Sequence, residues 1–142
     1  MNRRGLRRRY GRAGRHGGES FFDAYVTAAL WLSNDELDDS GGAPLDQNYS
    51  ASDLSASTRA EMRGDCARFQ KKAKPLLRKA YATGYDKAQA GQDFWLSRNG
   101  HGAGFFTRNL GEVGDELQDV ADEFGGFRLY VGDDGKIHGS RG

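Results

Sequence analysis

Hydrophobic side chains recur every three or four positions in the first half of the chain, which is the spacing of one face of an α-helix. A first helix is expected to begin at Ser20-Phe21-Phe22-Asp23, which resembles a capping box with Asp in place of the usual Glu. Acidic and glycine residues in the segment 34–44 are typical of a loop, so this helix should end there. The apolar face of the first helix consists of Phe21, Tyr25, Ala28 and Leu32.

A second, longer helix is predicted over residues 58–82, because Thr58-Arg59-Ala60-Glu61 forms a clearer capping box. Pro75 should kink or split this helix, since proline lacks the N–H group that an interior helical residue donates. Residues 45–56, which precede it, are expected to be irregular apart from a single helical turn. The predicted apolar face of the long helix consists of Met62, Cys66, Phe69, Ala73, Leu77 and Ala80.

Two further helices and a hairpin complete the pattern. Helical spacing predicts a third helix at about residues 85–97 and a fourth at about residues 112–124. Residues 127–137 read as a β-hairpin that turns at Asp133-Asp134-Gly135. The fold class that follows is α+β, with about four helices around an aromatic core and a C-terminal β-hairpin.

The N-terminal residues 1–18 differ sharply in charge from the rest of the chain. They contain seven arginines and neither lysine nor acid, which gives a charge of +7. The remaining 14 of the 21 basic residues lie in residues 19–142 together with all 20 acidic residues, which gives a charge of −6. An Arg/Gly-rich segment with few large apolar side chains cannot bury a core. We therefore expect a disordered arm at residues 1–18 and a single small domain at residues 19–142.

The arm is the first candidate for a functional surface. Guanidinium groups pair with phosphates, and a flexible Arg/Gly chain with an interleaved aromatic such as Tyr10 can follow a nucleic-acid backbone. The alternatives are a solvated tail and a tail that folds back on the acidic body at low salt. A mitochondrial-type presequence has a similar composition, but the glycines would break its amphipathic helix. The candidate nucleic-acid-binding residues are Arg3, Arg4, Arg7, Arg8, Arg9, Arg12 and Arg15.

The second candidate is the segment 92–106, in which glycine occupies every second position from Gly100 to Gly104. Glycine is chosen where the backbone needs a positive φ or where another group approaches closely, so the segment should have a specific backbone shape. It could form an anion-binding nest with His101 as a ligand contact or general base. The favoured alternative is a tight turn that packs Trp95 and Phe105 against the long helix. The candidate ligand-binding or structural residues are Trp95, Arg98, Asn99, Gly100, His101, Gly102 and Gly104.

Several stretches resemble a family of small proteins encoded in tailed-phage genomes. The resemblance covers about residues 20–137, and its specific parts are the segment from Asp93 to Phe105 and the hairpin sequence Leu129 to Gly135. Relatives tend to have Thr and Trp where this chain has Ser97 and Phe106. The family is uncharacterised, so the resemblance implies a phage setting and no activity. The other matching runs are Ala28-Ala29-Leu30-Trp31 and Pro44-Leu45-Asp46-Gln47-Asn48-Tyr49-Ser50.

Enzymatic and metal-binding patterns are weak. Asp93, Ser97 and His101 are spaced by four residues, but the glycines should end the helix before His101 reaches the other two. The scattered histidines and the single Cys66 give no zinc spacing, and the acidic run near residue 36 lacks the pattern of an EF-hand. Cys66 should be a buried core residue in a reducing compartment. We expect no enzyme, no metal and no cofactor, and no membrane-spanning segment.

Three functions remain open. The leading hypothesis is a non-enzymatic phage accessory protein in the cytoplasm of the infected bacterium that contacts nucleic acid through its Arg-rich arm. The alternative is a protein-binding inhibitor of a host or defence system, of the anti-CRISPR or another anti-defence type, that acts through an acidic helix face. A third is small-molecule or nucleotide binding at the glycine-rich loop around His101. The acidic face consists of Glu112, Asp115, Glu116, Asp119, Asp122 and Glu123.

Overall fold

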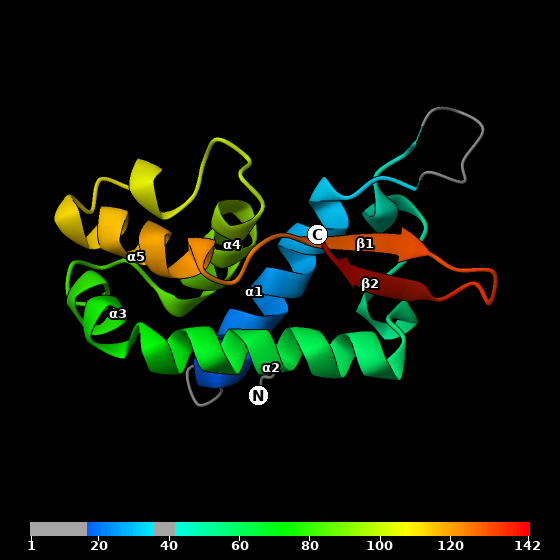
Figure 1. The fold of residues 1–142 in the computed structure, drawn as a ribbon, viewed down its shortest axis with the longest axis horizontal. Coiled ribbons are helices and arrows are strands. Elements are labelled where there is room, and N and C mark those ends of the chain that lie inside the picture. The colour runs from blue at the N-terminus through cyan, green and yellow to red at the C-terminus, as the bar shows by residue number, and fades with distance from the viewer. Residues whose placement is uncertain (1–16, 36–41) are drawn as a thin grey trace, which may run out of the picture.

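The computed structural model describes residues 17–35 and 42–142, and the predicted α+β fold is confirmed there (Figure 1). The arginines of the predicted arm lie outside the described residues. The described part contains five α-helices, three short 3₁₀ turns and one antiparallel hairpin. The helices are α1 (Gly17–Leu32), α2 (Ala56–Lys72), α3 (Lys74–Tyr81), α4 (Lys87–Arg98) and α5 (Glu112–Asp122), the 3₁₀ turns are Leu45–Gln47, Ala51–Asp53 and Phe105–Thr107, and the strands are β1 (Phe127–Val131) and β2 (Ile137–Arg141).

The core is a cluster of stacked aromatic rings, as predicted. Phe69 of α2 lies at its centre, with its ring 4.3 Å from that of Phe94 and 5.5 Å from that of Phe105, measured between centroids. Phe21 and Tyr25 of α1 pack on Phe94 from the other side, at 6.1 and 5.3 Å. Such rings bury large apolar areas, so this cluster joins α1, α2 and α4 into one core.

The predicted long helix is split, and Pro75 explains where. α2 ends at Lys72 and α3 begins at Lys74, so Ala73 is the break, with φ −97° and ψ 12°. Pro75 then lies in the first turn of α3, where its missing N–H group leaves no helical hydrogen bond unmade. The buried face of α2 and α3 is the one predicted from the sequence.

The predicted helix starts were less accurate. α1 begins at Gly17, three residues before the expected cap at Ser20 and inside the segment assigned to the arm. α2 begins before the capping box expected at Thr58, because Ser55 caps it by accepting a hydrogen bond from Thr58 N at 3.2 Å. The hydroxyl group of Thr58 instead accepts a hydrogen bond from Gly139 N of β2 at 3.0 Å. A side chain that the sequence assigned to a cap therefore fastens the hairpin to α2.

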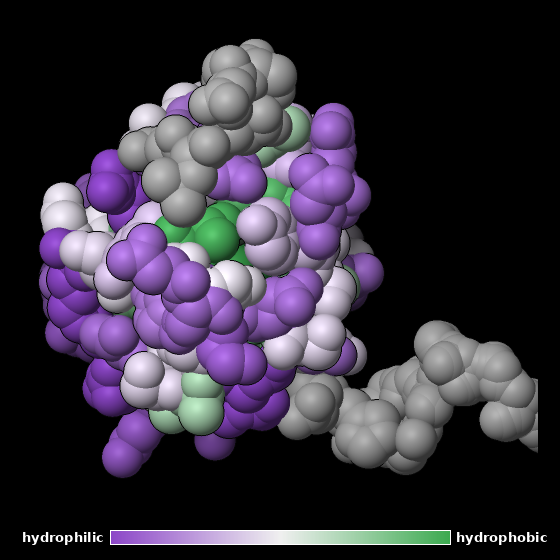
Figure 2. Space-filling model, turned by 90° about the vertical axis from the view of Figure 1, so that its right-hand side faces the viewer, coloured by the Kyte–Doolittle hydropathy of each residue, from purple (hydrophilic) through white to green (hydrophobic). Residues whose placement is uncertain are grey.

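The hairpin forms with the predicted turn, but it extends to Arg141 rather than ending at residue 137 as expected. Phe127 pairs with Arg141 and Val131 with Ile137, and the connecting loop contains Gly135 at φ +78°. Ser55 N donates to Ile137 O at 2.9 Å, so β2 is also held by the start of α2. Figure 2 views the molecule from this end, where the surface is mostly hydrophilic around a small hydrophobic area. Among the described residues, no helix is long and apolar enough to cross a membrane.

Candidate functional site

The glycine-rich loop has the backbone shape that its sequence predicted. Gly100, Gly102 and Gly104 all have positive φ, at +66°, +78° and +147°. Side chains other than glycine rarely adopt such values, so the alternation is a conformational requirement. Gly104 is also sterically confined, because a Cβ atom there would overlap the hydroxyl oxygen of Ser97.

The packing of this loop agrees in part with the expectation of a tight turn that packs Trp95 and Phe105 against the long helix. Phe105 is fully buried and stacks on Phe69 of α2, and its N–H group donates to Ser97 Oγ at 3.1 Å. Trp95 was also expected to pack against α2. It packs elsewhere, with its ring 5.4 Å from that of Tyr25 and 6.5 Å from that of Phe127. That expectation was wrong because Trp95 leaves α4 on the side that faces α1 and β1.

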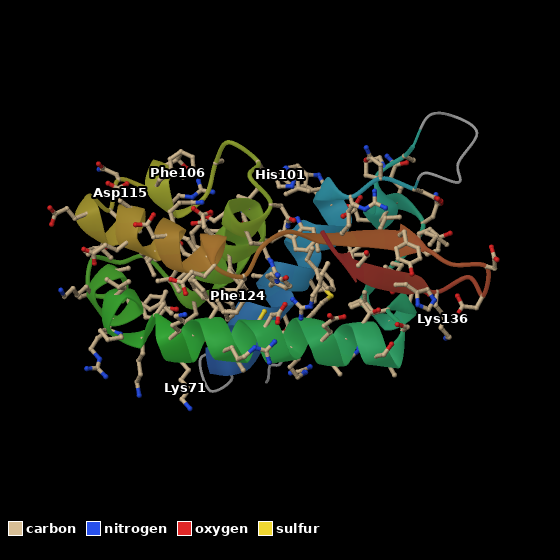
Figure 3. All side chains as sticks on the ribbon, in the orientation of Figure 1. Lys71, His101, Phe106, Asp115, Phe124 and Lys136 are labelled. Atoms are coloured by element: carbon tan, nitrogen blue, oxygen red, sulfur yellow. The ribbon has the colours of Figure 1, made fainter. Side chains whose placement is uncertain are left out.

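The polar residues of the loop separate into internal and external groups. Asn99 is internal: its amide donates to Trp95 O at 3.0 Å, and its carbonyl oxygen accepts from Phe127 N at 2.8 Å. His101 is exposed, and its side chain contacts no hydrogen-bonding partner within the described residues (Figure 3). The loop therefore connects α4 to β1 through Asn99, and only His101 is presented to solvent as a possible ligand contact.

Arg98, a candidate ligand residue, is instead buried in the protein. Its guanidinium group donates to Asp65 Oδ2 of α2 and to Tyr25 Oη of α1, both at 2.9 Å. It also donates to the backbone carbonyl oxygens of Gly125 at 2.8 Å and Phe124 at 3.1 Å. A buried charge is tolerated only when it is paired and hydrogen-bonded, and Arg98 meets both conditions. It joins α1, α2 and α4 to the chain that leads into β1.

Asp65 is the carboxylate of this network and receives a second arginine. Arg141 of β2 donates to Asp65 Oδ1 at 3.1 Å, and Arg68 forms a further ion pair with the same oxygen. Burial by itself would raise the pKa of Asp65, but the hydrogen bonds and charges of Arg141 and Arg98 outweigh burial and hold this pKa below its usual value. Asp65 is therefore an ionised structural residue that also anchors β2.

A second buried carboxylate occupies one end of the sequence trio Asp93, Ser97 and His101. Asp93 is fully buried, and Arg108 binds it through Nε at 3.0 Å and Nη2 at 2.8 Å. Tyr85 Oη donates to the same carboxylate at 2.6 Å. The three residues are not brought together, because Asp93 is engaged by Arg108, Ser97 holds Phe105 and His101 faces solvent. Within residues 17–35 and 42–142, no three His, Cys, Asp or Glu side chains are placed to hold a metal ion.

The folded part carries a basic surface that was not predicted from the sequence. Residues 67–85 contain six lysines and arginines and no acid, a signal that the division into a basic arm and an acidic body concealed. Lys72 of this run forms an ion pair with Glu123, and Arg68 one with Asp65. We define the basic surface as the four exposed cations that line one pocket and form no ion pair within the described residues: Lys71, Lys74, Arg78 and Lys87.

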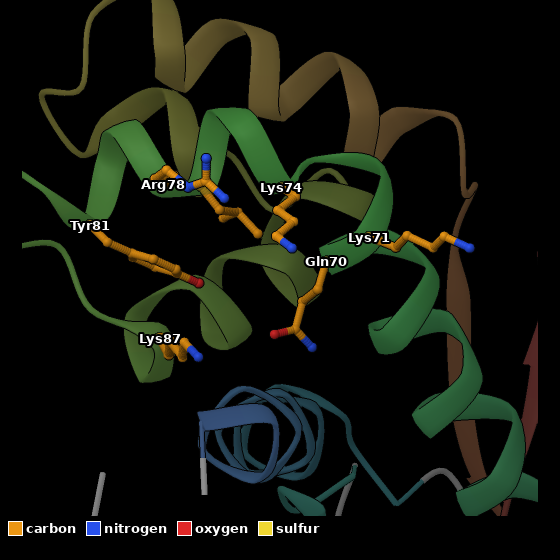
Figure 4. A pocket seen from close by; sticks show the side chains of 7 residues that line it. Gln70, Lys71, Lys74, Arg78, Tyr81 and Lys87 are labelled. Carbon is orange, nitrogen blue, oxygen red and sulfur yellow. The ribbon is translucent and has the colours of Figure 1, made fainter. Parts of the chain in front are cut away.

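The basic surface surrounds a pocket of about 470 Å³ between α2, α3 and α4. Gln70 and Tyr81 complete its lining, and Figure 4 shows the Tyr81 hydroxyl group directed toward the space between Gln70 and Lys87. That hydroxyl group is buried and has no hydrogen-bonding partner in the described part of the chain. Burial, and after it the charge of Asp86, raises the pKa of Tyr81 to about 12, so the group remains a proton donor at neutral pH.

The start of α1 lies beside this pocket. Phe21, in the second turn of α1, stacks on Phe69 at 6.0 Å, next to Gln70 in the sequence. The carbonyl group of Phe21 faces Gly91, one turn after Lys87 on α4. Figure 4 shows the beginning of α1 close to the pocket in the same arrangement. α1 therefore begins next to the basic surface.

The acidic helix face is exposed as predicted. All six of its side chains on and after α5 are exposed, and Lys72 pairs with one of them, Glu123. In Figure 3, Asp115 of this face and Lys71 of the basic surface lie on opposite sides of the molecule. Because Lys72 lies between Lys71 and Lys74 in the sequence, the acidic face and the basic surface adjoin at the Lys72–Glu123 pair.

No protein-family model matches the chain, and no curated protein or solved structure shows significant similarity to it.

Proposed function

We propose that the protein binds nucleic acid through two basic elements, the arginines of residues 3–15 and the basic surface between α2, α3 and α4. The observation that carries this proposal is the position, beside the start of α1, of four cations that form no ion pair among residues 17–35 and 42–142. Unneutralised cations on a folded surface repel one another, and a polyanion relieves this repulsion. In the setting that the sequence resemblance implies, the protein would be a tailed-phage accessory protein in the cytoplasm of the infected bacterium.

The two basic elements have complementary roles in this proposal. Seven arginines within a short Arg/Gly-rich segment supply many phosphate contacts and little geometric selectivity. The basic surface is held on three helices, so it can fix the position of the bound strand relative to the body. Glu123, at the end of the acidic face, is neutralised by Lys72, and Asp115 and Lys71 lie on opposite sides of the molecule in Figure 3, which limits repulsion of the nucleic acid.

The test is the salt dependence of binding by the full-length protein. We expect binding to DNA or RNA in the micromolar range or tighter at moderate salt, with a log–log salt slope as steep as about −5 to −6 if all seven arginines engage phosphates. Replacing the seven arginines by glutamine should flatten this slope and remove most of the affinity. The matched variant with seven lysines preserves the charge and should retain a steep slope. Absence of binding by the native protein, or equal binding by the glutamine variant, would contradict the proposal.

A second candidate function is supported by the exposed acidic face of α5, which could occupy a basic groove on a host or defence protein. Binding of this kind should survive the seven arginine-to-glutamine substitutions. Reversal of Asp115, Glu116 and Asp119 to lysine should slow association with the partner and leave the fold intact, since these side chains are exposed. Pull-down from host lysate with the glutamine variant measures this directly. This function would be favoured if one host protein is recovered in stoichiometric amount and is lost when Asp115, Glu116 and Asp119 are also replaced by lysine.

A further inference from the structure

We propose that the pocket between α2, α3 and α4 holds one unpaired nucleotide of a single-stranded nucleic acid, with its phosphate bound by the basic surface. This inference rests on the proposed function and adds to it a binding site and a strand preference. It replaces a diffuse electrostatic contact on the body with a defined recognition site.

The charge of the pocket selects an anion. Lys74 and Arg78 come from α3 and Lys87 from α4, so cations from separate helices line one pocket. In Figure 4 the ammonium group of Lys74 reaches toward Gln70, whereas Lys71 extends away from the pocket. Guanidinium and ammonium groups together with an amide donor are the groups that proteins use to bind phosphate. Lys74 is therefore the central phosphate contact, and Lys71 acts at longer range.

The size and the walls of the pocket indicate more than a bare phosphate. About 470 Å³ lies within the range of roughly 300–1,000 Å³ that small-molecule sites occupy. Leu77 and the ring of Tyr81 provide an apolar wall beside the cations. A nucleotide likewise combines an anionic phosphate with a flat aromatic base whose faces stack, and aromatic side chains next to basic groups are typical of single-strand recognition.

The hydroxyl group of Tyr81 supports a binding site in this pocket independently of the charge. A buried hydroxyl group without a hydrogen-bonding partner is unfavourable, and native structures contain few of them. This group points toward the space between Gln70 and Lys87, whose side chains are flexible. When those side chains turn to a bound phosphate, the hydroxyl group gains access to an acceptor. A duplex cannot use the site in this way, because its bases are stacked and paired in the interior.

The experiment compares full-length proteins binding a labelled oligothymidylate and a duplex of the same length. Lys74→Glu should weaken single-strand binding by about tenfold. Lys79→Glu, the same charge change on an exposed α3 residue outside the pocket lining, should weaken it by no more than about twofold. Both variants should weaken duplex binding equally. Tyr81→Phe should leave the stability unchanged or raise it slightly, since it removes a buried hydroxyl group that has no partner, and should weaken single-strand binding by roughly fivefold.

The outcomes separate this inference from the proposed function. Suppose that Lys74→Glu and Lys79→Glu weaken single-strand binding equally and that Tyr81→Phe binds the single strand with native affinity. These two results together would overturn the proposal that the pocket holds a nucleotide. The proposed function would then still stand if replacement of the seven arginines by glutamine removed binding. A native protein that binds neither probe would overturn both.

Discussion

Replacing Asp65 by asparagine should lower the free energy of unfolding by about 3 kcal/mol, because it leaves a buried arginine without its counter-charge. Arg98 is 5% exposed and depends on Asp65 for its only ion pair within the described residues. Asparagine has nearly the same shape but no charge, and its amide N–H₂ group cannot accept from Arg98 or Arg141. Urea unfolding followed by circular dichroism measures the change. The matched control Asp119→Asn, on the exposed face of α5, should change the stability by less than about 0.5 kcal/mol.

The same substitution should change how stability depends on pH. The pKa of Asp65 is lower in the folded protein than in the unfolded chain, where it is about 3.9. The stabilisation from ionised Asp65 is therefore fully present above pH about 4 and is lost as the pH falls through the lower pKa of the folded state. Asp65→Asn lacks this component, so its stability should fall less steeply with acid than that of the native protein. An Asp65→Asn protein as stable as Asp119→Asn would contradict the network's role.

Replacing Gly91 by alanine should destabilise the fold by about 2 to 3 kcal/mol, since the added methyl group forces α4 away from α1. A Cβ atom at this position would lie 2.8 Å from the carbonyl carbon of Phe21 and closer still to its oxygen. Backbone atoms cannot turn aside as side chains do. This clash outweighs the gain of about 1 kcal/mol that alanine brings to a helix interior. Thermal and urea unfolding are the measurements.

Gly64→Ala is the matched control for Gly91→Ala. It lies inside α2, but its added Cβ atom would meet only the tip of the exposed Arg68 side chain, at 3.3 Å. That flexible tip can move, so helix propensity should dominate and Gly64→Ala should be neutral or more stable by up to about 1 kcal/mol. Equal stability of the two alanine variants would show that α1 and α4 do not approach as closely as the structure has them.

The periodic parts of the fold could be predicted from the sequence because each depends on local spacing. The buried face from Met62 to Ala80 and the turn at Asp133-Asp134-Gly135 follow directly from helical and hairpin patterns. Helix starts were harder, because a cap depends on which side chain reaches the free N–H groups. Thr58 has a suitable side chain and sequence context, but its hydroxyl group is used by Gly139 of a strand that is distant in the sequence.

The buried charges could not be predicted because each depends on tertiary contacts. Arg98 was predicted only as a candidate ligand-binding or structural residue, and its partner Asp65 is 33 residues away. One signal was present: Asp65 is three residues after Met62 and four before Phe69, which puts a carboxylate on the apolar face of a helix. Such a position indicates a buried partner of opposite charge. Similarly, a glycine inside the helical pattern at Gly91 signals close approach by another segment.

Of the candidate sites, the glycine-rich loop was easier to predict than the basic surface. Alternating glycines indicate a special backbone, and the φ values of Gly100, Gly102 and Gly104 confirm this. The basic surface required counting charges over residues 67–85 and then knowing which of them are paired. The pairs of Lys72 with Glu123 and of Arg68 with Asp65 are visible only in the fold. Which cations of this run lack an ion pair therefore depends on tertiary contacts.

Nucleic-acid binding at the basic surface is tested most directly by an amide NMR titration of the isotope-labelled full-length protein with a short single-stranded oligonucleotide. We expect signals of the Arg-rich residues 3–15 to shift together with those around Lys74, Tyr81 and Lys87, while signals around Asp115 on α5 and Lys136 in the hairpin turn stay unchanged. Nucleic-acid binding at the basic surface would be contradicted by shifts confined to the Arg-rich segment, by shifts centred on the glycine-rich loop or α5, or by the absence of any shift.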